Sequence, residues 1–224
     1  MERNIHAIPQ KIQDNEKAGM EPEKVFQMLK EKIMWLELMP ESVLNISELA
    51  RVFNVSRTPV KEAMLLLQAE GWVLRQGAHF MVTPLSLDRI REITEIRSVL
   101  EVQANIWAMY RINDEELECL KKLEKQILEI DHSPNKEKVV EVDLTFHRIL
   151  FDATKNHQLA QHLDRLLCHF LRFWLSIPRD FEPKPSPANS IELIRAIADK
   201  DEARLRVASF NHIKWSMDEI MRTY

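Results

Sequence analysis

Asp143 and His147 are four positions apart in a stretch with helical periodicity, among the apolar residues Val140, Leu144 and Phe146. Side chains four residues apart lie on the same face of a helix, so this carboxylate and this imidazole could bind one divalent metal ion together. A hydrogen bond between the two side chains is the simpler interpretation, because helix surfaces often carry such pairs. The pair is therefore a candidate for part of a metal site or for a structural contact.

A second group of side chains, Arg57, Thr58 and Lys61, is suited to binding nucleic acid. The guanidinium group of Arg57 can donate hydrogen bonds to O6 and N7 of guanine. Thr58 and Ser56 can contact phosphates, and the ammonium group of Lys61 can contact either a base or a phosphate. These residues predict a DNA-contacting surface if they share the outer face of one helix. A helical hairpin with solvated charges is the alternative interpretation.

Two short helices joined by a tight turn are predicted for residues 45–71, and they would position this surface. Ser47 and Ser56 can each cap a helix, because a Ser oxygen accepts a hydrogen bond from an N–H group of the first turn. Asn54 suits the turn because Asn tolerates a left-handed backbone, and Pro59 suits the first turn of the second helix. In a helix-turn-helix, the N-terminal residues of the second helix meet the base edges in the major groove.

Residues 72–83 contain two alternating apolar runs broken near Gly77, a pattern typical of a β-hairpin. A helix, a helix-turn-helix and a hairpin in this order form a winged helix. The run Val55-Ser-Arg-Thr-Pro-Val-Lys-Glu-Ala63, the junction Ala69-Glu-Gly-Trp72 and the hairpin resemble the DNA-binding domain of GntR-type bacterial transcription regulators. The resemblance implies sequence-specific binding to double-stranded DNA.

The predicted wing departs from that family at its tip. Ala78 and His79 stand where relatives usually carry Arg-Gly, so the minor-groove contact is expected from His79 or from the backbone. The residues expected at the DNA are Ser47, Ser56, Arg57, Thr58, Pro59, Lys61 and His79.

The net charge does not favour DNA binding. The chain carries a net charge of −4, and between residues 20 and 85 eight acidic residues face seven basic ones. Many nucleic-acid-binding domains are strongly basic, so binding here must depend on the local arrangement of a few cations.

Length and composition predict a mainly α-helical protein. The 224 residues are 45% hydrophobic, which is enough for packed cores, and 3 Gly argue against sandwiches, barrels and Gly-rich phosphate loops. We expect a flexible arm at residues 1–19, a winged helix-turn-helix domain with a small β-hairpin at 20–85, and an all-helical effector-binding and dimerisation domain at 86–224. The first helix of the winged domain is expected to run from Pro22 to Pro40.

The second half of the chain has helical periodicity throughout and predicts an all-α bundle with short links. Six helices are expected, near residues 90–110, 114–130, 136–154, 156–174, 189–199 and 202–221.

The cysteines and the hydropathy pattern predict a cytoplasmic protein. Cys119 and Cys168 lie in helical patterns without metal-ligand spacing, so we expect both to be buried thiols in a reducing compartment. The N-terminus has no apolar run behind a basic start, and no stretch reaches the roughly 18 apolar residues of a membrane span. No membrane partner is expected.

Four motifs in the second half resemble the FCD ligand-binding domain of the FadR subfamily of GntR regulators, over nearly all of residues 85–224. These motifs are Glu95-Ile-Arg97-x-x-Leu-Glu101, Asp143-x-x-Phe-His147-x-x-Leu, Ala153-x-x-Asn156 and Ala208-x-x-x-His212. Many members bind a metal through one Asp and three His, and a small carboxylate effector completes the coordination. The resemblance implies that Asp143, His147 and His212 are three of these ligands.

Ser190 stands where the resemblance places the fourth ligand, a His. A Ser hydroxyl is a poor ligand for zinc or nickel, so a water or an effector oxygen would fill the gap, or the site would bind no metal. Either His162 or His169 could replace the missing ligand. The alternative interpretation is that both are packing or surface histidines without a role at the site. The implied cofactor is one divalent ion, zinc, nickel or manganese, and Ser190 is expected to face the effector.

Arg97 is predicted to face the interior of the bundle, between Ile93 and Leu100. A buried guanidinium needs an anion, and a carboxylate of the effector could bind it in a bidentate manner. An internal salt bridge with Glu101 or Asp143 is the alternative. In the family the matching Arg lines the ligand cavity, which favours a role in effector binding.

The combined resemblance implies a transcription regulator, with repression as the default. It would bind a pseudo-palindromic operator as a homodimer, and a small carboxylate in the bundle would change its affinity for DNA. A metal-free sensor of acyl-CoA or of another ligand on the same fold is one alternative. A metal-dependent enzyme is another, but no general base or nucleophile recurs at a recognisable spacing, so we expect no catalytic residues.

Overall fold

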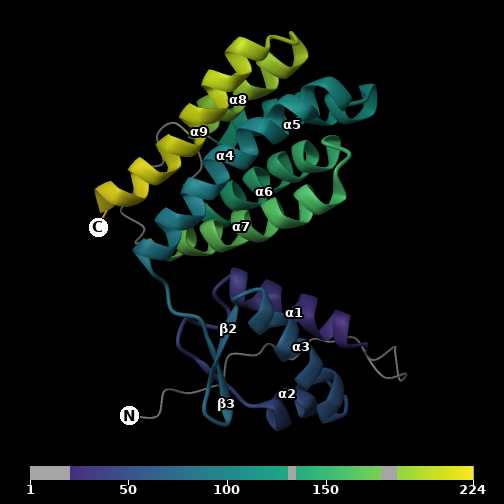
Figure 1. Ribbon diagram of the computed structural model, residues 1–224, viewed down its shortest axis with the longest axis vertical. Helices are drawn as coiled ribbons and strands as arrows, with labels where there is room; N and C mark the ends of the chain where they lie inside the picture. The colour runs from purple at the N-terminus through teal and green to yellow at the C-terminus, as the bar shows by residue number, and fades with distance from the viewer. Residues whose placement is uncertain (1–20, 131–134, 178–185, 224) are drawn as a thin grey trace. The chain divides into compact units, whose positions relative to one another are not determined.

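The computed structural model describes residues 21–130, 135–177 and 186–223, and the chain folds into two compact units, Met1–Leu85 and Ser86–Tyr224 (Figure 1). The arm expected at residues 1–19 lies outside the described residues. Each unit has its own buried core. The predicted fold class is confirmed, since helices dominate both units and the strands belong to one small sheet of the first.

The first unit is a winged helix-turn-helix with a three-stranded antiparallel sheet. Its elements, in chain order, are α1 (Pro22–Met34), β1 (Val43–Leu44), α2 (Ile46–Val52), α3 (Arg57–Ala69), β2 (Val73–Gln76) and β3 (His79–Val82). The strand order is β1-β3-β2, so the predicted hairpin supplies β2 and β3. Leu44 pairs with Phe80, which adds the unpredicted strand β1 to the sheet. A strand of two residues is too short to show an alternating pattern in the sequence.

Helix α1 ends at Met34, six residues before the end predicted at Pro40. The backbone N–H of Trp35 still bonds to the carbonyl of Glu31, at 2.9 Å, but Leu36 then adopts a positive φ of 59°. A left-handed residue stops the helical hydrogen-bond pattern. The proline therefore follows the end of the helix rather than causing it.

The caps of the helix-turn-helix differ in part from the prediction. Asn45, and not Ser47, caps α2, because its Oδ1 accepts hydrogen bonds from the N–H groups of Ser47 (2.9 Å) and Glu48 (3.3 Å). Ser47 instead lies inside the first turn of α2. Ser56 occupies the N-cap position of α3, as predicted, but its side chain makes no capping hydrogen bond. Asn54 has the predicted left-handed backbone, with φ of 52°.

Within its described residues, the second unit forms the predicted bundle, with six helices. They are α4 (Leu87–Arg111), α5 (Asp114–Ile130), α6 (Lys136–Ala153), α7 (His157–Ser176), α8 (Ser186–Ala198) and α9 (Glu202–Thr223). Asn135 and Asn156 cap α6 and α7 through their side-chain oxygens, which fixes where these helices begin. Helix α4 packs against α6, α7 and α9, so its inner face lies within the bundle (Figure 1).

The core of the bundle is apolar, with a group of polar side chains embedded beside it. Phe146, Leu150 and Leu193 belong to the main hydrophobic cluster and are almost fully buried. Cys168 is buried as predicted, but Cys119 is exposed, because it lies on the solvent-facing side of the amphipathic helix α5. Within the described residues, no helix combines the length and the apolar character needed to cross a membrane.

Candidate functional site

The surface of the winged unit brings together three of the predicted DNA-contacting residues. Arg57, Thr58 and Lys61 are exposed at the N-terminal end of α3 and line an open depression of about 600 Å³. Ile46, Glu62 and Leu65 complete its lining. The apolar side chains of Ile46 and Leu65 were not predicted as part of this surface, because an apolar residue in a helix is first assigned to the core. An apolar side chain at such a surface can contact the methyl group of thymine.

The other predicted DNA-contacting residues lie elsewhere on the winged unit. Ser47 and Ser56 are exposed at the starts of α2 and α3, and Pro59 is half-buried in the first turn of α3. His79 is exposed at the start of β3, paired with Gln76 across the hairpin. None of these four lines the depression that contains Arg57.

The hairpin turn places one cation at its tip that the sequence analysis missed. Gly77 makes the turn with φ of 60°, a backbone conformation that side chains disfavour. The Nε atom of Arg75 donates to the carbonyl of Gly77 at 3.3 Å, which holds the guanidinium group against the turn. The wing therefore has an arginine next to its tip, one strand away from the position where the family usually carries it.

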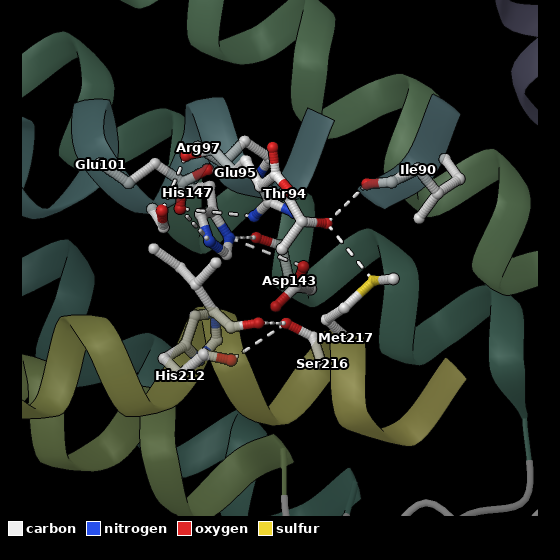
Figure 2. A network of polar contacts seen from close by, with 12 residues as sticks. Ile90, Thr94, Glu95, Arg97, Glu101, Asp143, His147, His212, Ser216 and Met217 are labelled. Carbon is white, nitrogen blue, oxygen red and sulfur yellow. Dashed lines mark hydrogen bonds and ion pairs between the residues drawn. The ribbon is translucent and has the colours of Figure 1, made fainter. Parts of the chain in front are cut away.

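In the helical unit, the three predicted metal ligands come together from two helices. Asp143 and His147 on α6 and His212 on α9 each offer a ligand atom, and these atoms lie within 4.8 Å of one another. Figure 2 shows the His147 side chain between α4 and α9, with Asp143 beside it. His147 and His212 are 3% and 4% exposed, and their ring centroids are 5.1 Å apart. The two histidines lie 65 positions apart in the sequence, so only the tertiary fold creates the cluster.

Glu101 is a fourth polar member of the cluster that the sequence analysis did not assign to the site. Its side chain is 1% exposed and forms an ion pair with Arg97, and its Oε2 lies 3.6 Å from Nε2 of His147. The Arg97–Glu101 salt bridge confirms one of the two alternatives considered for Arg97. The bidentate contact predicted for Arg97 is therefore made with Glu101, whose carboxylate accepts hydrogen bonds from Nε and Nη2 of Arg97. Nη1 of Arg97 has no hydrogen-bond partner among the described residues.

The pKa values in the cluster follow from burial and from these charges. Burial would raise the pKa of Glu101, but the nearby Arg97 and His147 lower it to about 2. Burial would lower the pKa of His147, but the carboxylates of Asp143 and Glu101 raise it above the usual value. Burial lowers the pKa of His212 to about 4, and the neighbouring His147 acts in the same direction. His212 is therefore neutral near pH 7.

These residues fit a divalent metal ion. A neutral imidazole can coordinate a metal without first losing a proton, and Nδ1 of His212 is buried with no hydrogen-bond partner in the described part of the chain. Two atoms bound to one ion at about 2.1 Å lie at most about 4.2 Å apart. The candidate ligand atoms lie within 4.8 Å of one another, so small movements of the side chains would bring them to the distances that an ion requires. One carboxylate and two imidazoles suit zinc, nickel or manganese.

A small cavity adjoins this cluster. Its volume is about 30 Å³, and its polar lining comes from Arg97, Asp143, His212 and Ser216. Arg97 lines this cavity while it is paired with Glu101, and its role in effector binding stays a prediction. Ser190 is buried in α8, at 4% exposure, but it does not line this cavity.

The two histidines considered as replacement ligands lie outside the metal cluster. His162 is exposed on α7, and His169 is buried on the same helix. Neither joins the group of candidate ligands found among the described residues.

Comparisons with known proteins match both units. Residues 22–79 match the family model of bacterial regulatory proteins, gntR family, and residues 92–214 match the model of the FCD domain. YdhC of Bacillus subtilis, an uncharacterized HTH-type transcriptional regulator, is 28% identical over 194 residues, covering 84% of this chain and 86% of YdhC. LutR, an HTH-type transcriptional regulator of the same organism, is 26% identical over 216 residues, covering 84% of this chain and 95% of LutR.

Two solved structures have the same fold. Escherichia coli McbR/YncC superposes with a TM-score of 0.78 at 21% identity, over 91% of this chain and 98% of that protein. A putative GntR transcriptional regulator from Rhodococcus sp. RHA1 superposes with a TM-score of 0.72 at 18% identity, over 91% of this chain and 98% of that protein. At these identities the structures support the fold alone.

Proposed function

Since the chain belongs to the GntR family of bacterial transcriptional regulators and carries an FCD domain, we propose that it is a ligand-controlled repressor that acts as a homodimer on a pseudo-palindromic operator. A small carboxylate, bound in the helical unit with the help of a divalent metal, would lower its affinity for the operator. Coupling between two such sites is typically about 1–3 kcal/mol, or roughly 5- to 150-fold in affinity.

The observation that carries the sensing half of this proposal is the buried polar cluster. Two groups that can donate hydrogen bonds or coordinate, Nη1 of Arg97 and Nδ1 of His212, are buried without partners in the described residues and belong to side chains that line the same cavity. A buried polar group without a partner costs free energy, so a metal ion bound by the imidazole of His212 and an anionic ligand bound by Nη1 of Arg97 would together be bound favourably. The other two candidate metal ligands, Asp143 and His147, would hold that metal ion together with His212.

The size of the cavity favours a small effector over an acyl-CoA. Pockets for drug-sized ligands measure roughly 300–1,000 Å³, whereas the cavity beside the cluster measures about 30 Å³. A ligand with only a few atoms beyond its carboxylate requires the least rearrangement of the surrounding side chains. An operator titration with and without a panel of small carboxylates tests the proposal, and an unchanged affinity with every member would contradict the sensing role.

Replacing Arg57 with alanine should weaken operator binding by about 1–3 kcal/mol, since a bidentate contact to a base contributes roughly this much. Arg57 is exposed at the start of α3, so its removal leaves the buried core of the unit unchanged. Fluorescence anisotropy with the operator and with variants of it should show that sequence preference relaxes along with affinity.

The control for this experiment is Arg91→Ala, which removes a similarly exposed arginine from α4 in the other unit. Its operator affinity should match that of the unaltered protein. If Arg57→Ala leaves affinity and sequence preference unchanged, then α3 is not the recognition helix.

The proposed homodimer would use the outer faces of α4 and α9. Among the described residues of the helical unit, all but one of the exposed large apolar side chains lie on these two helices: Ile96, Val99, Tyr110, Val207, Phe210 and Met221, with Leu128 on α5 as the exception. The two helices run antiparallel side by side, as three contacts show: Thr94 with Met217, Asn105 with Ser209, and Tyr110 with Glu202. Exposed apolar residues concentrated on one surface mark an interaction site, and a two-fold interface is the commonest kind in soluble oligomers.

Replacing Val99 with glutamate should weaken dimerisation at least about tenfold, which corresponds to about 1.4 kcal/mol. Val99 is 71% exposed, so the charge is well solvated in a monomer but would lose water in the interface. Sedimentation analysis over a range of concentrations measures the effect. Leu128→Glu, at an exposed apolar residue of α5, is the matched control and should leave the dimer intact. Equal dimerisation of both variants would place the interface elsewhere.

A further inference from the structure

Two apolar side chains lie beside the cations in the depression at the start of α3. Leu65 on α3 is 49% exposed, and Ile46, the first residue of α2, lines the same depression. An exposed leucine gains free energy when a partner covers it, so its place in a proposed binding surface suggests that it contacts the bound molecule. The pair adds an apolar contact to the polar ones that Arg57 and Lys61 offer.

Leu65 shares the outer face of α3 with the residues that can bind DNA. Arg57, Thr58, Lys61, Glu62 and Leu65 fall within less than half of the circumference of the helix, and all five line the depression. Leu65 comes eight positions after Arg57, which is about 12 Å along the helix. Neighbouring base pairs are about 3.4 Å apart. If Arg57 contacts a guanine, Leu65 therefore faces a base pair within about four positions of it.

The composition of the depression suits the edges of base pairs better than the sugar-phosphate backbone. A carboxylate such as that of Glu62 repels phosphates, and the side chains of Ile46 and Leu65 have no donor for them. In the major groove, a carboxylate can instead accept a hydrogen bond from N4 of cytosine, and an apolar side chain can cover the methyl group of thymine. Arg57 and Lys61 supply the charge that attracts DNA to this surface.

A leucine at a base edge discriminates between base pairs in two ways. At an A·T pair it covers the thymine methyl group, and the burial of one methyl group strengthens binding about fourfold. At a G·C pair it would remove water from O6 and N7 of guanine and from N4 of cytosine without replacing their hydrogen bonds, which is unfavourable. The base pair that faces Leu65 should therefore be A·T.

Resting on the operator-binding function proposed above, we propose that Leu65, together with Ile46, is a specificity-determining residue that recognises the methyl group of one thymine in each operator half-site. This thymine lies within about four base pairs of the guanine that Arg57 contacts. The cations and the leucine of α3 thus recognise different chemical groups of the same half-site. A duplex that keeps every base-pair hydrogen bond but lacks this methyl group binds more weakly.

Deoxyuridine tests this contact, because it pairs like thymidine and lacks only the methyl group. The full-length protein first selects a duplex from a random-sequence pool, and each thymine of that duplex is then replaced in turn by deoxyuridine. Fluorescence anisotropy should show one position in each half-site at which the replacement weakens binding about fourfold. Replacement in both half-sites should multiply the two effects. Unchanged affinity after every replacement would overturn the proposal.

Two variants assign the methyl contact to its side chain. Leu65→Ala should bind the unmodified duplex about fourfold more weakly and should bind the deoxyuridine duplex equally well, because the group that covers the methyl is gone. Leu66→Ala removes another exposed leucine of α3, which is 42% exposed and lies outside the depression, and is the matched control. It should keep the fourfold difference between the two duplexes.

Both variants should fold like the unaltered protein, because both leucines are exposed and alanine favours the helix. Equal melting temperatures of Leu65→Ala and Leu66→Ala check this expectation. A methyl-group effect that persists in Leu65→Ala, or that disappears in Leu66→Ala, would show that another residue makes the contact.

The outcomes separate this inference from the function on which it rests. If the protein selects no duplex, or if Arg57→Ala leaves affinity and sequence preference unchanged, both the role of α3 and this inference fail. If Arg57→Ala weakens binding and deoxyuridine has no effect at any position, the inference alone fails and operator binding through α3 stands. Metal and effector binding in the helical unit are tested separately and do not depend on either result.

Discussion

Glu101→Ala should lower the free energy of unfolding of the helical unit by about 3–5 kcal/mol, the usual effect of removing one partner from a buried ion pair. Glu101 is 1% exposed and contacts both Arg97 and His147. Its removal leaves the guanidinium group of Arg97 buried at 1% exposure with no anion bound to it. Urea denaturation measures the change, with the transition of each unit fitted separately, because a chain of two units need not unfold in one step.

Two further variants decide whether the unpaired guanidinium group of Arg97 causes the loss of stability in Glu101→Ala. Glu118→Ala removes a solvent-exposed glutamate of α5 and should leave the unfolding midpoint unchanged. The double variant Arg97→Met/Glu101→Leu replaces both charges with apolar groups of similar size and should recover most of the lost stability. If the double variant is no more stable than Glu101→Ala, the loss comes from the cavity left by the side chain and not from the unpaired guanidinium.

Removing the metal should have the second-largest effect. A ligand that binds only the folded state at 100 times its dissociation constant stabilises it by about 2.7 kcal/mol, which raises the melting temperature of a unit of this size by roughly 5–11 °C. Chelator-treated protein should therefore melt at lower temperature and recover when zinc, nickel or manganese is added. His147→Ala should abolish the recovery, because it removes one of only three protein ligands that the described residues provide.

The control for the metal experiment is His162→Ala. This histidine was the exposed alternative to the missing fourth ligand, so its removal should leave the metal-dependent shift unchanged. If none of the three metals raises the melting temperature of the unaltered protein, the metal-binding part of the proposal is wrong. If His162→Ala abolishes the shift, the metal lies on the surface of α7 instead.

The local parts of the fold could be predicted from the sequence, because they depend on neighbouring residues. The left-handed turn at Asn54 was predicted because Asn tolerates this backbone conformation better than most residues. The cap of α2 was assigned wrongly to Ser47, because Asn45 has the same capping ability two positions earlier and the pattern does not separate them. Strand β1 was missed because its stability comes from pairing with β3, which lies more than 30 positions later.

The site could be predicted only in part, because it is assembled from distant segments. The spacing of Asp143 and His147 suggested a shared helix face, but nothing local linked them to His212 on α9, which was assigned through the family resemblance. The salt bridge between Arg97 and Glu101 was one of two alternatives, and spacing alone could not decide between a protein carboxylate and an effector carboxylate. The contact of Glu101 with His147 joins α4 to α6 and has no signature in the sequence.

Helix α4 carries residues of the two proposed sites on opposite faces. Arg97 and Glu101 are buried beside the proposed effector site, whereas their neighbours Ile96 and Val99 are exposed on the proposed dimer face. An α-helix moves as a rigid element over such a short distance, so a ligand that shifts Arg97 would also shift the residues that contact the second protomer. The two effector sites of a dimer would then bind cooperatively, with a Hill coefficient above one. In a monomer made by Val99→Glu, the binding curve would become a simple hyperbola.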